Sequence, residues 1–600
     1  MNTTPPRGMA VLEHDVLRSR GWRAGRCAST WREPRPTRCM SSRSRQGTSR
    51  WSEHAEPTSS PARRDFLRPM FQLRSGRVTT GMIRQHAGPS APESDPMLEV
   101  DHTGENAAGP VAVAMTPTRT GPSAVPWFYR LKRSFWASII RGLIDTSAPL
   151  PLRLPRDEDL GRLKLVPLSE LSKGVAPMQY IITTRHVPHD ERSLAKVVLL
   201  KVVALLALPL RLGTPGLPRI QTGVSLEDLD AATAQNLGDC YPAIWDEAPA
   251  EPGAVVRKSR RLPPAAPAEL RAHPEDIVGA VALAGPFAAF IRAVPDTPGR
   301  FVMDMTGLEP YPVRSGYESL GGKATLAWSS DQGRMVTICL QMPDGRIIHK
   351  PEPASAALTD PEWRRAQDIF LASVSTYMTA VTHLVGCHLK GAGEPAAAAA
   401  HTLPAAHPLR IFLHPFVHET LSTNNYKVPT LIHGDAALLP AFFALSAETV
   451  QRIAEDAAAV FDIADYDPRE DARRRGMHAF AGPYPYLQDT LALWDLFEDY
   501  ASKMLDHIYP TDAELEADEA VVAWLALWTQ MSPSVAEYVP DLNKAAIARV
   551  LATIIFIATV VHENVGNTTW NYTVLHAWIP TRVPVDAARD TIEVQQDYMN

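Results

Sequence analysis

Paired cysteines are missing from this chain. Its five cysteines lie far apart, and none forms a CxxC pair. Disulfide frameworks and zinc knuckles need closely spaced cysteines, so neither scaffold is predicted. Cys387 directly precedes a histidine, but adjacent residues on a helix point about 100° apart. We therefore interpret Cys387 as a small buried residue and not as a metal ligand.

Uninterrupted apolar runs of membrane-spanning length, about 18 residues or more, are also missing. Residues 197–212 come nearest, but Lys201 and Pro209 break the run, which therefore predicts a core helix. With 600 residues, 45% hydrophobic and 21% charged, the chain is long enough to bury one large core with additional parts. We expect a cytoplasmic monomer that binds no nucleic acid.

Lysine is absent from residues 1–80, which hold 16 arginines and six acidic residues and so carry a net charge of about +10. Because the whole chain carries −6, residues 81–600 carry about −16. Hydrophobic periodicity is lacking until about Pro126. Such a segment cannot bury enough apolar surface to offset its ordering entropy. We predict that residues 1–122 are a disordered or spurious extension; a basic arm or a transit peptide is the alternative.

A catalytic domain is predicted over residues 123–600. It opens with an amphipathic helix, residues 127–144, that is basic on one side. We expect this helix to pack on the domain, with peripheral contact to a membrane surface as the alternative.

Three histidines stand inside long apolar stretches that predict buried helices. His383 and His388 lie in residues 360–390, and His562 lies in residues 542–565. A buried imidazole without a partner costs about 1–3 kcal/mol. A metal ion would satisfy all three rings, although a single histidine in such a helix is more often a hydrogen-bonded core residue.

The spacing of the first two histidines does not by itself decide for a metal. Five residues on a regular α-helix leave two side chains about 140° apart. A π-bulge between His383 and His388 would bring their rings closer, and such bulges concentrate at functional sites.

The surroundings of these histidines contain short motifs that resemble the lipoxygenase family in order and spacing, over most of residues 180–590. They are Asp190-Glu-Arg192, Ala284-Gly-Pro286, the extended pair 324–328 and 335–342, Trp363 with Ala366, His407-Pro through Thr420-Leu-Ser-Thr-Asn424, Arg475-Gly-Met477, Tyr484-Pro-Tyr486, Leu493-Trp-Asp495 through Tyr500, and Trp578-Ile-Pro580 to Pro584.

The resemblance implies a mainly α fold, a large lipoxygenase-type helical domain with a small β portion. It also implies one non-haem iron, or manganese as the alternative metal, held by His383, His388 and His562. Family members add O2 to polyunsaturated fatty acids and form hydroperoxides. No alternating strand pattern supports a preceding β-barrel domain, so a compact form is expected.

The fourth ligand departs from the family, which usually places an asparagine four residues after the third histidine. Here that position is Gly566. Asn567 serves only if the helix is widened there, and a water is the alternative. Asn564 is a poor candidate, because it lies about 160° from His562 in projection.

Two further departures from the family concern the end of the chain and the segment after His388. The family's last ligand is the carboxylate of its C-terminal residue, and the sequence given ends at Asn600, so we expect that ligand to be absent. A fold that keeps lipid affinity without a complete metal site is therefore the alternative to an active dioxygenase. The alanines 396–400, which replace a bulkier segment of the family, predict an exposed helix, and an enlarged pocket is the alternative.

Overall fold

The computed structural model describes residues 154–171, 178–192, 268–426, 428–434, 438–566 and 578–586. All of them belong to one compact unit, Arg84–Asn600. The predictions for residues 1–122, 127–144 and 197–212 lie outside the described residues.

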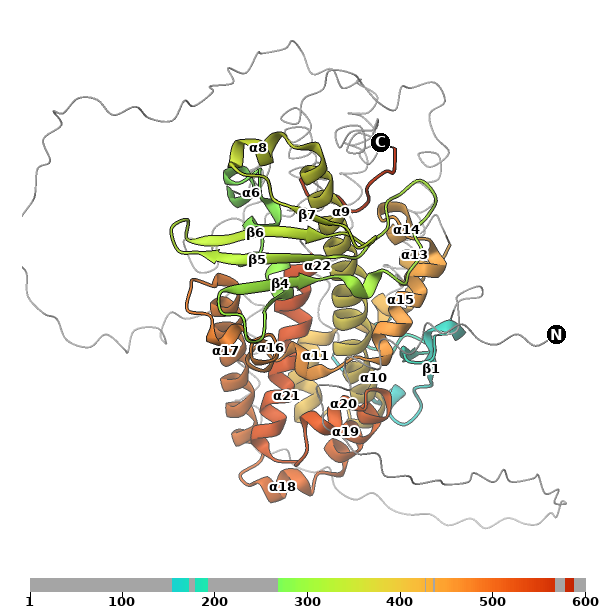
Figure 1. Ribbon diagram of the computed structural model, residues 1–600. Coiled ribbons are helices and arrows are strands. Elements are labelled where there is room, and N and C mark those ends of the chain that lie inside the picture. Colours follow the sequence, from blue (N-terminus) through green and yellow to red (C-terminus); the bar gives the residue numbers. More distant parts are fainter. Residues whose placement is uncertain are drawn as a thin grey trace, which may run out of the picture. The chain divides into compact units, whose positions relative to one another are not determined.

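Most of the described chain is helical, as the sequence predicts (Figure 1). The α-helices are α6 Ala268–Ala272, α7 Ile277–Ala280, α8 Ala354–Thr359, α9 Pro361–Tyr377, α10 Gly393–Thr402, α11 Pro408–Val417, α12 Thr420–Tyr426, α13 Val428–Ile432, α14 Leu438–Phe442, α15 Ala447–Ala459, α16 Pro468–Arg474, α17 Pro485–Ile508, α18 Asp512–Glu516, α19 Glu519–Met531, α20 Ser534–Tyr538, α21 Lys544–Phe556 and α22 His562–Gly566. Two π-helices, η6 Met378–Gly391 and η9 Ile557–Val561, join some of them.

The β portion is an antiparallel meander in the order β3-β4-β5-β6-β7. Its strands are β3 Ile291–Ala293, β4 Arg300–Asp304, β5 Lys323–Ser329, β6 Arg334–Gln341 and β7 Ile347–His349. The predicted pair 324–328 and 335–342 is therefore confirmed as β5 and β6, whereas the other three strands are too short to be recognised in the sequence. A separate pair, β1 Leu165–Pro167 and β2 Ile182–Thr184, is also antiparallel.

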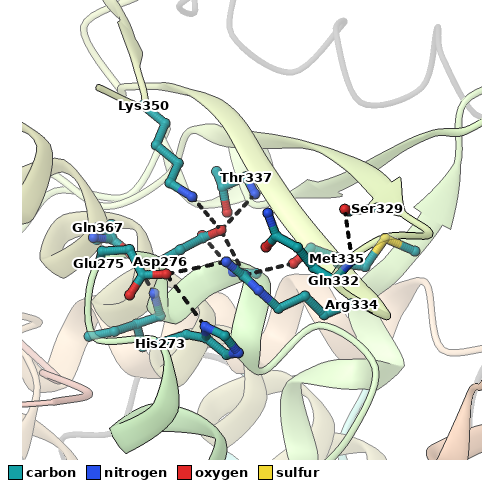
Figure 2. Close-up of polar contacts among 12 residues, drawn as sticks. His273, Glu275, Asp276, Ser329, Gln332, Arg334, Met335, Thr337, Lys350 and Gln367 are labelled. Carbon is teal, nitrogen blue, oxygen red and sulfur yellow. Dashed lines mark hydrogen bonds and ion pairs between the residues drawn. The ribbon is translucent and has the colours of Figure 1, made fainter. Parts of the chain in front are cut away.

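A buried carboxylate ties the sheet to the helices. Asp276, completely buried, caps α7 by accepting from the backbone N–H of Gly279. Figure 2 shows that Arg334 and Lys350 also reach it, at 3.0 and 3.1 Å. The backbone N–H of Thr337 donates as well. We call these groups the Asp276 cluster; every donor in it comes from α7 or from the strand region around β6 and β7.

Two long helices run side by side through the core (Figure 1). The first comprises α9 and η6. It begins where Asp360 accepts a hydrogen bond from the N–H of Trp363. The second comprises α21, η9 and α22, and Asn543 caps it. Both were predicted from apolar stretches that carry the three histidines.

By length and composition alone, the helical stretches Pro361–Thr402 and Lys544–Gly566 would also be able to cross a membrane. Core helices satisfy the same test, and most of the first stretch is buried inside the fold. Their apolar composition is accounted for by this packing, because a helix surrounded by protein is hydrophobic on every side.

The prediction of an exposed alanine helix is wrong. Ala396–Ala400 lie in α10 and are buried, with Ala397 and Ala398 completely inaccessible. The helix packs against α19, where the indole of Trp524 donates to the carbonyl of Pro395. Small side chains let two helices approach closely, and this close packing, not exposure, explains the alanine run.

Candidate metal centre

The wider turns of the two core helices bring the histidines together. In a π-helix the backbone hydrogen bonds run between residues five apart, so such residues lie one above the other. His383 and His388 are five apart within η6, and their rings therefore share a face. The π-bulge between them, considered from the sequence, extends here over the whole of η6.

The third histidine arrives from the neighbouring helix. His562 is the first residue of α22 and directly follows the second π-helix, η9. The two helices are close because Gly391 of η6 has no side chain. A Cβ at this position would lie 2.7 Å from Cγ2 of Ile557, closer than real Cβ atoms approach. Gly391 thus allows η9 to lie against η6.

The three rings meet through their Nε2 atoms. Nε2 of His388 lies 3.2 Å from Nε2 of His383 and 3.1 Å from Nε2 of His562. The ring centroids are 4.8 to 4.9 Å apart. We call these three residues the histidine cluster. Among the residues that the structure describes, it is the one group of three or more His, Cys, Asp or Glu with converging ligand atoms.

The separations fit a shared metal ion. Two imidazole nitrogens bound to one ion at about 2.1 Å lie about 3.0 Å apart when they meet it at a right angle. The observed distances of 3.1 and 3.2 Å are close to this value. A network of neutral imidazoles would satisfy them less well, because each ring has a single N–H to donate.

Electrostatics favour the neutral, ligating form of His383. Although part of its surface is accessible, burial lowers its pKa well below the usual value, and the neighbouring His388 and His562 lower it further. A neutral imidazole keeps the lone pair that a metal needs. His383 therefore offers a lone pair to the point where the three rings converge.

A residue that had no predicted role contacts the backbone of the histidine cluster. Asn424 belongs to the motif at the start of α12, and its Nδ2 donates to the carbonyl of His388 at 2.7 Å. Its side chain is nearly inaccessible. The motif itself was recognised, but its contact with η6 was not predictable from spacing.

A second polar group fixes the end of η6. Lys390 is buried and donates to Glu394, to the carbonyl of Tyr180 and to that of Met531. Ser532 donates to the other oxygen of Glu394 at 2.6 Å. Burial raises the pKa of Glu394 to about 7, although Lys390 opposes this. The lysine, which stands two residues after His388, gave no signal in the sequence.

Other predicted residues have structural roles. Cys387 is buried, as expected, and burial strongly raises its thiol pKa. His407 caps α11 and contacts Asp518 through Nε2 at 3.0 Å. Arg475 donates to the carbonyl of Ile291 and to the hydroxyl group of Tyr484. The second of these hydrogen bonds joins two of the recognised motifs. Asn567 lies outside the described residues, so its predicted role as a ligand is untested.

Comparison with known proteins points in one direction. The family model described as Lipoxygenase matches residues 321–595. A human hydroperoxide isomerase is 26% identical over 204 residues, which cover 33% of this chain and 27% of that protein. A linoleate 9/13-lipoxygenase of Pseudomonas aeruginosa is 26% identical over 206 residues, which cover 34% of this chain and 30% of that protein. The chain thus matches about a quarter to a third of the length of these curated relatives.

The fold is shared with solved lipoxygenase structures. One of them, a lipoxygenase variant in complex with arachidonate, superposes with a TM-score of 0.53 at 13% identity. The superposition covers 79% of this chain and 72% of the other. At this identity the likeness concerns the fold, which is that of the lipoxygenase catalytic domain.

Proposed function

Because this chain belongs to the lipoxygenase family, we propose that it is a non-haem iron dioxygenase that adds O2 to polyunsaturated fatty acids and releases lipid hydroperoxides. The observation that carries the proposal is the convergence of three Nε2 atoms, two from the π-helix η6 and one from the first residue of α22. Imidazole ligands suit iron, and they leave further positions for exogenous ligands.

The proposed ligands are His383, His388 and His562. A bound iron would supply the one-electron redox chemistry that removal of a hydrogen atom from a bis-allylic carbon needs. The protein contributes the geometry: η6 supplies two ligands, α22 supplies the third, and Asn424 holds the backbone of His388. Fixed ligands of this kind need little rearrangement when the metal binds.

The apolar surroundings suit the proposed substrate. Val385, Leu384 and Val565 are buried beside the histidines. An acyl chain gains free energy by leaving water for such a surface, at roughly 0.8 kcal/mol for each buried CH2 group. In a metal-loaded centre the same apolar side chains would limit the access of bulk water to reactive intermediates.

The first test measures metal content together with conjugated-diene absorbance, with linoleic and arachidonic acids as substrates. We expect about one iron per chain, diene formation, and loss of both in His388→Ala. The matched control is His349→Ala, because His349 is exposed on β7. This control should retain metal and activity.

Other outcomes separate the alternatives. A folded protein that binds no metal would favour a lipoxygenase fold without catalysis. Metal with no diene product, but consumption of a fatty-acid hydroperoxide, would favour an isomerase such as the human relative. Iron that remains bound in His388→Ala would contradict the proposed ligand set.

A further inference from the structure

A small cavity lies between the alanines of α10 and the charged side chains of two other segments. Its volume is about 20 Å³. The lining includes three alanines and three polar residues: Ala396, Ala399, Ala400, Asp190, Arg410 and His414. The alanines are three or four positions apart and therefore share one face of the helix. Within the described part of the chain, no member of the histidine cluster lines this cavity, so it is a separate site.

Two buried charged side chains in the lining have hydrogen-bonding capacity left over. Only 5% of the Asp190 side chain and 4% of the Arg410 side chain is exposed. Nη1 of Arg410 donates to the carbonyl of Leu403, but among the described residues Nη2 of Arg410 and Oδ1 of Asp190 have no hydrogen-bond partner. Nη2 lies 3.6 Å from Oδ2 of Asp190, which allows charge attraction but is too long for a hydrogen bond. A buried charged group that lacks a hydrogen bond costs free energy, so both atoms require a further partner.

We propose that the cavity binds a single water molecule, which donates a hydrogen bond to Oδ1 of Asp190 and accepts one from Nη2 of Arg410. Polar groups more than roughly 3.5 Å apart are commonly joined in this way. An internal water needs roughly 10–15 Å³ of space and at least two polar partners, and this cavity supplies both. The inference is independent of the proposed function.

The charges around the cavity favour a neutral occupant. A cation would lie against the guanidinium group of Arg410. An anion would lie against the carboxylates of Asp190 and Glu191, which also lines the cavity. Water offers both a donor and an acceptor and carries no charge, so it satisfies both buried groups without repulsion from either.

The bound water would connect segments that are far apart in the chain. Asp190 belongs to residues 178–192, and Arg410 belongs to α11. The neighbouring Glu191 accepts a hydrogen bond from the backbone N–H of Ser422 in α12 at 2.7 Å. The water bridge and this hydrogen bond together would fix the segment around Asp190 to α11 and α12.

The experiment places side chains of the same shape, with and without a hydroxyl group, in the cavity of the full chain. Ala399→Thr and Ala399→Val add nearly equal volume, but only threonine can replace hydrogen bonds of the displaced water. The matched controls are Ala398→Thr and Ala398→Val, because Ala398 is completely buried and points away from the cavity-lining face in helical projection. The equilibrium constant for unfolding in urea is measured for all four variants.

At position 399 we expect the equilibrium constant for unfolding to be about tenfold larger with valine than with threonine, since valine leaves the buried charged groups without a partner. At position 398, where no water is displaced, threonine should be the less stable of the two, because it buries a hydroxyl group. X-ray diffraction from crystals of the unchanged full chain should also show the electron density of one water within hydrogen-bond distance of Asp190 and Arg410.

The inference is overturned if valine at position 399 is at least as stable as threonine, because the cavity would then be dry. It is also overturned if the electron density shows an ion between Asp190 and Arg410, or a direct hydrogen bond between them and nothing in the cavity. If the variants at position 399 do not fold, the diffraction experiment decides alone.

Discussion

Two polar clusters lie within this apolar fold, and they differ in how their hydrogen-bonding groups are matched. In the Asp276 cluster a single carboxylate accepts from two backbone N–H groups and from the side chains of Arg334 and Lys350. In the histidine cluster three rings turn the same kind of atom toward one another. The first cluster is complete without a ligand, whereas in the second the three Nε2 atoms converge in an arrangement that can hold a metal ion. Burial of polar groups alone therefore does not mark a functional site; an excess of one kind of group does.

The largest effect is expected from removal of the carboxylate at the centre of the Asp276 cluster. Asp276→Ala leaves Arg334 and Lys350 without their buried partner, and we expect it to lower the free energy of unfolding by about 3–5 kcal/mol. Chemical denaturation measures the change. Asp344→Ala serves as the control, because Asp344 pairs with Arg346 at the surface, and it should have little effect. Equal effects in the two variants would show that the Asp276 cluster does not hold the sheet to the helices.

The end of the histidine-bearing helix is held by apolar packing as well as by polar groups. Ala398 of α10 is completely buried, and the helix packs against α19. Ala398→Leu should cost about 1–3 kcal/mol of stability through overpacking. The same change at exposed Ala354 of α8 should be nearly neutral in thermal denaturation. If Ala398→Leu leaves the stability unchanged, the buried position of the alanine run would be contradicted.

The histidine cluster also includes a hydrogen bond in which donor and acceptor are paired: the side-chain amide of Asn424 donates to the backbone carbonyl of His388. Asn424→Ala should weaken metal binding by about tenfold while the protein stays folded. Competition with a chelator measures this affinity. Asn425→Ala, which removes an amide whose contacts are with Thr184 and Leu421, should leave metal binding unchanged. If both variants bind metal normally, the contact with His388 does not position the ligand.

The last test concerns Glu394, which has hydrogen-bond partners but can change its protonation state. Its pKa in the fold, about 7, lies above its ordinary value of 4.5. The folded protein thus retains a proton that the unfolded chain has lost, so this group makes the protein less stable as the pH rises from 4.5 to about 7. Glu394→Gln removes the titration. The stability difference between the two proteins should change across this interval and stay constant above it; a constant difference throughout would exclude the raised pKa.

Much of this architecture was predictable from local pattern. The apolar stretches around His383 and His562 predicted both core helices, and the extended pair 324–328 and 335–342, which resembles the strand pair of the family, predicted β5 and β6. The caps at Asp360 and Asn543 are ordinary helix starts. Such features depend on neighbours in the sequence and can therefore be read from it.

What escaped prediction depends on residues far apart in the chain. The buried alanines 396–400 are explained by α19, more than a hundred residues away. Lys390 finds its acceptors at Tyr180 and Met531, and Asn424 meets His388 across a helix boundary. The sequence predicted which histidines converge through family resemblance, but a regular helix would have kept His383 and His388 apart. The long π-helix is a property of the packed core.

The width of η6 has a consequence for how this chain can vary over time. Since hydrogen bonds in η6 join residues five apart, the four residues between His383 and His388 set the alignment of the two rings. Replacing Leu384, Val385 or Cys387 with another apolar residue keeps that alignment, whereas a side chain at Gly386 would clash with the hydroxyl group of Tyr466. Deleting or inserting one rotates one ring away from the other. Change within this stretch is therefore confined to substitution, and a length difference between His383 and His388 in any descendant would mark the loss of the centre.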